Sequence, residues 1–424
     1  MPQILKQAEA DPAGLLARYN EVRDTSTALA AALAPEDMVV QTMDDVSPAK
    51  WHLAHVTWFF ETFVLKSLDG YQVFHPQFEV LFNSYYNAVG PQYPRPRRGL
   101  LSRPTVEQVM EYRAYVDQAM TAALAGDMLD PDVRAVVELG LHHEQQHQEL
   151  LLMDIKHVFF QNPLLPVYRD AEPVAAGAGS EFRWLGFEGG ESQQGVRSNT
   201  GFSFDNEGPR HAVRLAPFEL GNRLVTNSEY QEFIEAGGYR EPSLWLSDGW
   251  ALVREEDWQA PFYWVRRDGR WFEFTLHGLH PVQPNTPVSH LSFFEADAYA
   301  SWRQARLPTE SEWEFVAAGL PVTGNFLDNP WLGPMAAAGE GLQQVFGDLW
   351  EWTASPYQAY PGFRPAAGAL GEYNGKFMCS QMVLRGGCAV TPAGHVRASY
   401  RNFFYPHQRW MFSGVRLARD AAAG

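Results

Sequence analysis

The sequence predicts a two-domain protein in which a four-helix bundle precedes a mixed α+β domain. At 424 residues the chain is too long for one compact core, and its 46% hydrophobic residues can fill two or three. Helical periodicity dominates residues 8–161, whereas residues 180–424 combine glycines and scattered tryptophans with short alternating runs such as HAVRLAPFEL. The intervening NPLLPVYRDAEPVAAGAG has the composition of a linker. We therefore expect domains at 1–163 and 180–424, joined by a linker at 164–179.

Four helices are expected in the first domain. They span residues 12–33, a stretch from Ser47-Pro48, a stretch from Thr105, and residues 131–160. Ser47 and Asp130 are expected N-caps, because a proline follows each at the first helical position. The core of a four-helix bundle commonly holds metal ligands that project from facing helices. In the second domain, helices are expected near 226–236 and 294–305.

Composition favours a small-molecule partner. A net charge of −17 argues against nucleic acid, whose backbone requires clustered Lys and Arg. No run of eighteen apolar residues predicts a membrane span, and MPQILKQAEADPAG lacks the apolar core of a signal peptide, so we expect a cytoplasmic protein. Two cysteines, Cys379 and Cys388, fit a reducing compartment and cannot build a disulfide framework.

The segment LHHEQQHQELLLMDIKH, residues 141–157, is the strongest candidate for a metal site. His143 and His147 lie about 40° apart around a helix axis, one turn from each other, so both can reach one ion. His142 lies about 100° from His143 and cannot easily join them. The alternative is a helix whose histidines are merely half-buried. The second helix, SPAKWHLAHVTWFFETFVL, offers His52 or His55 as a third ligand, and helical geometry leaves both open because they are only about 60° apart.

Three neutral imidazoles would leave coordination positions open, as in a catalytic site. The long loop between the second and third helices, HPQFEVLFNSYYNAVGPQYPRPRRGLLSRPT, is rich in aromatic and basic residues, which favours function over disorder. Its arginines, of which Arg95 and Arg98 are the candidates, could bind a substrate carboxylate. The alternative is that they pair with structural carboxylates.

Several ordered motifs resemble known families. EGPRHAVRLAPFELGNRLVTNSEYQEFIEAGGY, PVSHLSFFEADAYASWRQARLPTESEWEFVAAG, FGDLWEWTASPY, VLRGGCAV and FSGVRLAR resemble the sulfatase-modifying-factor domain, a C-type-lectin-like fold of the formylglycine-generating type. WHLAH and HHEQQHQE resemble the DinB-like four-helix bundle. The two domains in this order resemble the sulfoxide synthases of ergothioneine biosynthesis, the hercynine oxygenases.

The resemblance implies a non-haem iron(II) enzyme. Such enzymes use O₂ to join a thiol sulfur to C2 of the imidazole of Nα-trimethylhistidine (hercynine), giving a sulfoxide. The family pattern maps its metal ligands onto His143, His147 and the second histidine of WHLAH, His55, with His52 as a neighbour. Glu149 lies about 200° from His147 around the helix, so it is expected to orient or cap rather than to bind metal.

The resemblance also assigns substrate contacts. Gln146 is expected to hydrogen-bond a substrate whose imidazole binds the iron. Asn402 matches the asparagine that meets the carboxylate or ammonium end of the betaine. A trimethylammonium group favours aromatic faces, and Phe403, Phe404 and Tyr405 follow directly, although aromatic residues are more often core.

Departures from the family pattern indicate the thiol substrate. Family members that use γ-glutamylcysteine carry an aspartate and an arginine where this chain has Phe404 and Gln408, so free cysteine is the expected donor. The loop with Tyr85 and Tyr86 resembles the cysteine-using branch, in which a loop tyrosine stands near the iron. Either tyrosine could supply a proton or hydrogen atom and steer the reaction away from thiol dioxygenation.

The family pattern also bears on activities other than sulfoxide synthesis. Formylglycine-generating enzymes use a reactive cysteine pair where this chain has Thr391 and Val396, so copper-dependent sulfatase activation is not expected, and Cys388 is expected to be buried. The alternatives are a selenoneine or ovothiol-type synthase of the same architecture, and a noncatalytic betaine-binding module with a structural metal. The oligomeric state is left open.

Overall fold

A computed structural model describes residues 12–126, 129–171, 177–197 and 201–421. The chain forms two compact units: the first combines residues 1–168 with Arg197–Asp205 and Arg364–Lys376, and the second contains the remainder. The described part leaves out residues 1–11, in which no signal peptide was expected. It also leaves out residues 172–176 of the expected linker. No helix in the described ranges combines the length and apolar character needed to cross a bilayer.

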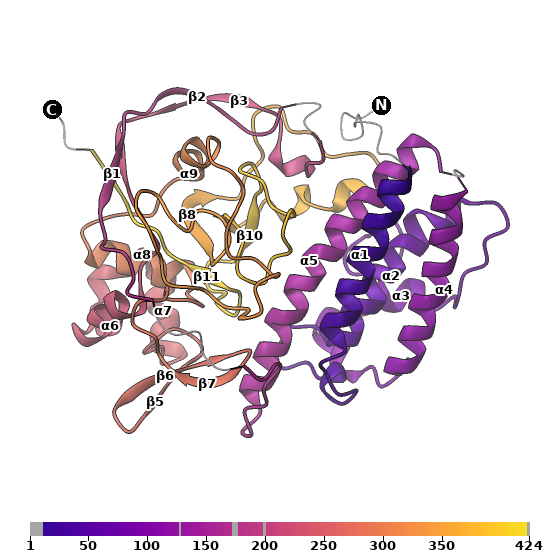
Figure 1. The fold of residues 1–424 in the computed structure, drawn as a ribbon, viewed down its shortest axis with the longest axis horizontal. Coiled ribbons are helices and arrows are strands. Elements are labelled where there is room, and N and C mark those ends of the chain that lie inside the picture. The colour runs from indigo at the N-terminus through magenta and orange to yellow at the C-terminus, as the bar shows by residue number, and fades with distance from the viewer. Residues whose placement is uncertain (1–11, 127–128, 172–176, 198–200, 422–424) are drawn as a thin grey trace. The chain divides into compact units, whose positions relative to one another are not determined.

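The first unit is the expected bundle of four long helices, α1, α2, α4 and α5 (Figure 1). Its helices are α1 Pro12–Ala30, α2 Ala49–Phe63, α3 Phe78–Phe82, α4 Val106–Ala125 and α5 Pro131–Gln161. Helix α2 packs against α4 and α5, and its residues from Ala49 to Glu61 are buried. A helix that is buried on all sides forms the centre of a domain, so α2 is where ligands shielded from water can stand.

At Thr105 and Asp130, but not at Ser47, the predicted start of a helix coincides with its observed N-cap. Asp130 caps α5 by accepting the Val133 N–H, and Thr105 forms a capping box with Gln108 at the start of α4. The prediction that Ser47 caps α2 is wrong: Pro48 occupies the N-cap position, without a side-chain cap. Ser47 is engaged elsewhere, because its N–H donates to Asp154 at 2.8 Å and its hydroxyl accepts from Arg98 at 2.9 Å.

Gly140 on α5 allows α2 and α5 to approach closely. A Cβ atom at this position would lie 2.6 Å from the Phe60 ring and 2.9 Å from the Phe59 ring. Any larger residue would therefore push the helices apart. His143 lies one turn after Gly140, so this contact brings His143 towards α2.

The second unit has the expected α+β character. Its helices are α6 Asn227–Glu235, α7 Ser247–Glu255, α8 Phe293–Trp302 and α9 Glu310–Ala317. Its strands are β1 Trp184–Phe187, β2 Gly190–Gln194, β3 His211–Leu215, β4 Phe218–Gly221, β5 Trp264–Arg267, β6 Arg270–Thr275, β7 Gly278–Pro281, β8 Trp350–Pro356, β9 Met382–Arg385, β10 Asn402–Phe404, β11 Ser413–Gly414 and β12 Ala418–Asp420. The expected helices 226–236 and 294–305 correspond to α6 and α8.

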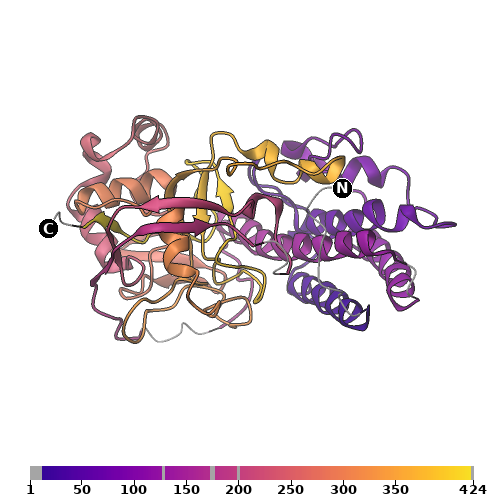
Figure 2. The same ribbon diagram turned by 90° about the horizontal axis from the view of Figure 1, so that it is seen from above.

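The described strands form small sheets with the orders β1-β4-β12, β10-β9-β8-β11, β2-β3 and β5-β6-β7. The run HAVRLAPFEL forms two strands, because Pro217 separates β3, which pairs with β2, from β4. Figure 2 shows β2 and β3 as two adjacent arrows. Of the two segments that belong to the first unit, 197–205 lies between β2 and β3, and 364–376 lies between β8 and β9.

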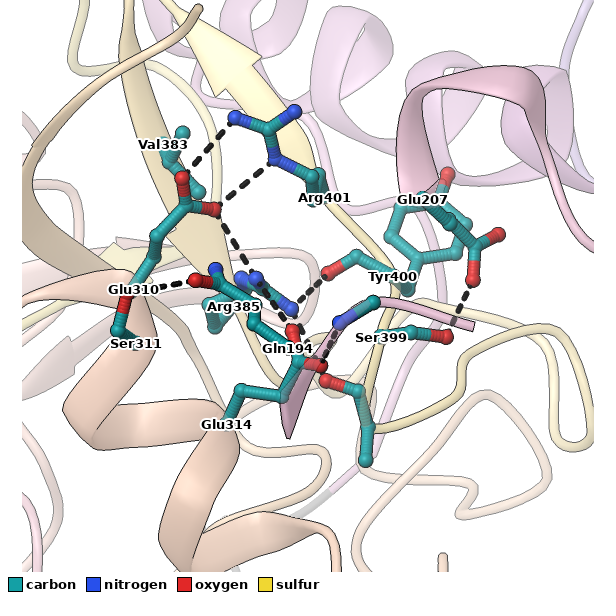
Figure 3. Close-up of polar contacts among 12 residues, drawn as sticks. Gln194, Glu207, Glu310, Ser311, Glu314, Val383, Arg385, Ser399, Tyr400 and Arg401 are labelled. Carbon is teal, nitrogen blue, oxygen red and sulfur yellow. Dashed lines mark hydrogen bonds and ion pairs between the residues drawn. The ribbon is translucent and has the colours of Figure 1, made fainter. Parts of the chain in front are cut away.

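A buried ionic network fixes strands β9 and β10. Arg385, at the end of β9, lies 3.0 Å from Glu310 and 2.9 Å from Glu314, both on α9. Arg401, directly before β10, pairs with both oxygens of Glu310 at 2.9 and 3.0 Å. Figure 3 shows the two guanidinium groups converging on Glu310. The antiparallel register pairs Asn402 with Leu384, so the network sets the position of Asn402 on its strand.

His157 on α5 predicts a pH dependence of stability. Its Nδ1 lies 2.6 Å from the Thr42 hydroxyl, and burial lowers the pKa of His157 from 6.5 to about 4. Between pH 6.5 and 4 the unfolded chain binds a proton that the folded chain does not, so the free energy of unfolding falls as pH falls. From pH 7 to 5 the His157→Leu variant should lose up to about 2 kcal/mol less stability than the wild type. Urea unfolding of both proteins at the two pH values measures the difference, and equal losses would contradict it.

Candidate metal centre and active site

His55 on α2 and His143 and His147 on α5 lie together in the core of the first unit. Each offers a ring nitrogen, and these nitrogens lie within 4.8 Å of one another. The three ring centroids form a nearly equilateral triangle with sides of 4.9, 4.8 and 4.7 Å. His55 Nε2 is 3.2 Å from His143 Nε2. Two nitrogens bound about 2.1 Å from one ion would lie about 3.0 to 3.4 Å apart, so the spacing of His55 and His143 fits a shared metal.

His55 is oriented by the backbone and by two tryptophans. Its Nδ1 lies 2.6 Å from the carbonyl oxygen of Phe82, which can only accept, so Nδ1 carries the proton and Nε2 a lone pair. Its ring stacks against Trp51 at 4.6 Å and Trp58 at 5.5 Å. The Nε2 atom therefore faces the triangle as a ligand nitrogen should.

Burial keeps the three imidazoles neutral. Burial lowers the pKa of His143 to about 3, and the pKa values of His55 and His147 are also well below their usual value, mainly through burial. Metal ions bind neutral imidazole, so the site needs no deprotonation at neutral pH. His143 Nδ1 is buried without a hydrogen-bond partner, and its ring packs instead at 4.8 Å from the Phe59 ring.

The structure groups His55, rather than His52, with the α5 pair. His52 Nδ1 lies 2.8 Å from His147 Nδ1, on the side of that ring away from Nε2, and His52 Nε2 lies 2.9 Å from Asp154. The two histidines that helical geometry left open thus have different surroundings. Only tertiary partners distinguish them.

The other polar residues of the α5 motif face different neighbours. His142 stacks on Phe202 at 3.9 Å, which agrees with its expected exclusion from the triangle. Glu144 pairs with Arg23 and Arg113; these charges outweigh the effect of burial and lower the pKa of Glu144 to about 2. Glu149 is buried, and its orienting or capping role stays a prediction.

Gln146 lies beside the histidine triangle and meets an aromatic residue from the segment 364–376. Tyr373 donates a short hydrogen bond to Gln146 Oε1, and its ring lies 5.7 Å from that of His143. Phe204, from the segment 197–205, stacks on Tyr373 at 5.5 Å. Tyr373 and Phe204 could not be found from the sequence, because no local pattern links them to residues some 60 to 230 positions away.

The segment that carries Tyr85 and Tyr86, residues 83–90, is called the tyrosine loop. It directly follows Phe82, whose carbonyl oxygen anchors His55. Asn83 follows Phe82 and bonds the backbone of Tyr86, accepting its N–H at 3.0 Å and donating to its carbonyl at 3.0 Å. The Tyr85 and Tyr86 rings stack at 4.6 Å, and their hydroxyls lie 3.5 Å apart. Burial raises the pKa of both phenols above their usual value, so both keep their protons at neutral pH.

Two charged residues of the segment 364–376 hold this loop. Glu372 accepts the N–H groups of Asn87 at 3.0 Å and Ala88 at 2.7 Å. Lys376 donates to the carbonyl of Tyr85 and lies 5.2 Å from the centre of its ring. Tyr85 also packs edge-on against Tyr373 at 6.4 Å. Each of the two tyrosine rings is thus one aromatic side chain away from His143: Tyr85 packs on Tyr373 and Tyr86 on Phe59, and both of those rings contact the His143 ring.

The two candidate arginines of the loop have different surroundings. Arg98 is buried, donates to the hydroxyls of Ser47 and Ser84, and lies 3.4 Å from the centre of the Trp51 ring. Burial holds the pKa of Arg98 well below its usual value. Arg95 is exposed and donates to the backbone carbonyl of Asp45. Both contact neutral oxygens, and their role in substrate binding stays a prediction.

The remaining candidates lie in the second unit. Asn402 Oδ1 accepts the N–H of Phe403, whose ring stacks on Tyr357 at 4.1 Å, and Phe404 packs edge-on against Trp410. Gln408 accepts the Tyr405 N–H at 2.9 Å and closes a turn.

Cys388 is buried, as expected, and its sulfur accepts from the Thr391 hydroxyl at 3.3 Å. Thr391 and Val396, at the two positions of the reactive pair, carry no thiol, so neither can replace a reactive cysteine.

Comparison with known proteins covers both units. The family model of the DinB superfamily matches residues 18–151 of this chain. The model of the sulfatase-modifying factor enzyme 1-like domain matches residues 184–338 and 332–421. Hercynine oxygenase of Mycolicibacterium smegmatis is 34% identical over 88% of this chain and 91% of its own length. Hercynine oxygenase of Mycobacterium tuberculosis shows the same identity and coverage. Formylglycine-generating enzyme of Thermomonospora curvata is 28% identical over 55% of this chain and 91% of its own length. The chain belongs to the hercynine oxygenase family.

Proposed function

We propose that this protein is a non-haem iron(II) sulfoxide synthase that uses O₂ to join the sulfur of cysteine to C2 of the hercynine imidazole. The triangle of neutral histidines, of which His55 and His143 are buried and His147 is half-buried, carries the proposal in a member of this family. His55, His143 and His147 would hold iron(II), which supplies the redox chemistry when bound. Three protein ligands leave coordination positions for substrates.

Residues around the triangle have complementary tasks. Gln146 is oriented by Tyr373 and presents a side-chain amide to an imidazole held beside the histidines. Tyr85 is half-buried and Tyr86 is buried, and both keep their phenol protons at neutral pH, which suits proton donation during oxygen reduction. Packing of Tyr373 on Phe204 adds an aromatic wall that helps to exclude water.

Cysteine is the proposed thiol substrate. Phe404 carries no charge, and Gln408 is buried in a turn, so neither can form an ion pair with a γ-glutamyl group. Asn402, Phe403 and Phe404 are proposed to bind the betaine, whose trimethylammonium group suits aromatic faces. Arg95 and Arg98 are the proposed cations for the carboxylate of cysteine.

Reconstitution tests the proposal. Metal-free protein is loaded with iron(II) anaerobically, and hercynine, cysteine and O₂ are then added. The expected product contains hercynine, cysteine and O₂ less one water, because one oxygen atom enters the sulfoxide and the other leaves as water. Binding of hercynine without turnover would favour a betaine-binding module instead, and preference for γ-glutamylcysteine would overturn the assignment of cysteine.

Removing both loop phenols should change the product rather than the metal site. In a Tyr85→Phe/Tyr86→Phe variant the rings still pack, but no proton is available from this loop. We expect unchanged iron content and a shift from sulfoxide to cysteine sulfinate, measured by mass spectrometry. Tyr115→Phe, at an exposed tyrosine of α4, serves as the control. An unchanged ratio of the two products would refute the role of the phenols.

A further inference from the structure

Asp154, His52 and His147 form a hydrogen-bonded chain that links α5 to α2. Asp154 Oδ2 lies 2.9 Å from His52 Nε2, and His52 Nδ1 lies 2.8 Å from His147 Nδ1. The same carboxylate oxygen accepts the backbone N–H of Ser47 at 2.8 Å. Asp154 is 3% exposed and His52 is 4% exposed, so water does not compete for the bond between them. His147, at the other end, is half-buried.

Donor and acceptor chemistry decides which nitrogen carries the proton at each step of the hydrogen-bonded chain from Asp154 through His52 to His147. A carboxylate oxygen accepts, so His52 Nε2 is the donor to Asp154. A neutral imidazole with its proton on Nε2 has a lone pair on Nδ1, so His52 Nδ1 accepts and His147 Nδ1 donates. His147 is then left with its lone pair on Nε2, the nitrogen that is free of this chain.

We propose that Asp154 and His52 are positioning residues that hold His147 in the tautomer whose Nε2 can bind the metal. The inference rests on the proposed function, because it takes His147 as an iron ligand. With the proton order reversed, His147 Nε2 would carry a proton and could not bind a metal. The first histidine of WHLAH therefore supports a ligand, and the second, His55, uses the Phe82 carbonyl for the same purpose.

The test measures iron(II) affinity by anaerobic competition with a chelator, together with the thermal midpoint of each protein. His52→Leu removes the acceptor for His147, and Asp154→Ala removes the group that orders His52. Both variants should bind iron about 10- to 100-fold more weakly than the wild type. In Asp154→Asn an amide oxygen can take the place of Oδ2 and accept from both Ser47 and His52. We expect this conservative variant to lose less than about threefold in affinity, since the proton order is kept.

His157→Leu is the matched control, because it also replaces a buried histidine by leucine, and the Nδ1 of His157 on α5 contacts the Thr42 hydroxyl rather than a histidine of the triangle. His157 also lies within electrostatic reach of Asp154, whose bonds to His52 and Ser47 the substitution leaves in place. Its thermal midpoint should fall while its iron affinity stays unchanged. Equal affinity of His52→Leu and the wild type would overturn the inference, as would a loss that follows the thermal midpoint across all variants, His157→Leu included. A loss in Asp154→Asn equal to that in Asp154→Ala would also overturn it, because charge rather than proton order would then matter. Failure of the wild type to bind iron would instead overturn the metal site itself.

Discussion

Alanine in place of His143 is expected to abolish stoichiometric iron binding. Outer partners of metal ligands contribute about 10- to 100-fold to affinity, so loss of a ligand should cost more than about 100-fold. The remaining pair, His55 and His147, would be too few to hold a labile iron(II) ion through gel filtration. Iron per chain after anaerobic loading and desalting measures the effect.

His142→Ala provides the matched control for this experiment. The two histidines are adjacent on α5 and both are buried, but His142 stacks on Phe202 rather than facing the triangle. The control should retain iron near one per chain. Retention of iron by His143→Ala, or an equal loss from His142→Ala, would contradict the assigned ligand set.

Methionine in place of Arg385 is expected to destabilise the second unit by about 3–5 kcal/mol, the usual cost of leaving a buried charge without its partner. Arg385 is fully buried and also donates to the carbonyl oxygens of Ala398 and Tyr400 at 2.9 and 3.1 Å. Its loss would leave Glu314 buried without this partner and would free the end of β9. Urea unfolding, together with hydrogen exchange of the β9 amides, measures the effect.

Arg419→Gln is the control for charge removal as such. Arg419 pairs with Glu219 at the surface, where the side chains are 43% and 25% exposed. Exposed pairs contribute about 0–1 kcal/mol, so this variant should unfold near the wild type. Equal stability of the Arg385 and Arg419 variants would contradict the structural role given to the buried network.

The sequence predicts features that depend on local spacing. Asp130-Pro131 and Thr105 mark helix starts, and the spacing of His143 and His147 places them on one face of α5. Fold class and family follow from motifs spread over both domains. The five-residue helix α3, which directly precedes the tyrosine loop, is too short to give a periodic signal.

Features that depend on long-range partners could not be predicted. Ser47 has the residue type of an N-cap, but Asp154 and Arg98 occupy its polar groups. His52 and His55 are indistinguishable by helical angle, and the Phe82 carbonyl and the Asp154 carboxylate separate them. Tyr373 reaches Gln146 across 227 positions of sequence, a contact that no local pattern encodes.

The membership of residues 197–205 and 364–376 in the first unit constrains how such a chain could evolve. A gene truncated after the bundle would still encode every histidine of the triangle, yet it would lack Phe204, Tyr373 and the Glu372 contacts to the tyrosine loop. A chimaera in which another protein's C-terminal half replaced that of this chain would lose the same groups, unless residues 197–205 and 364–376 of this chain were kept. The two domains are therefore expected to be inherited as a pair, with substitutions in the inserts matched by substitutions in the loop.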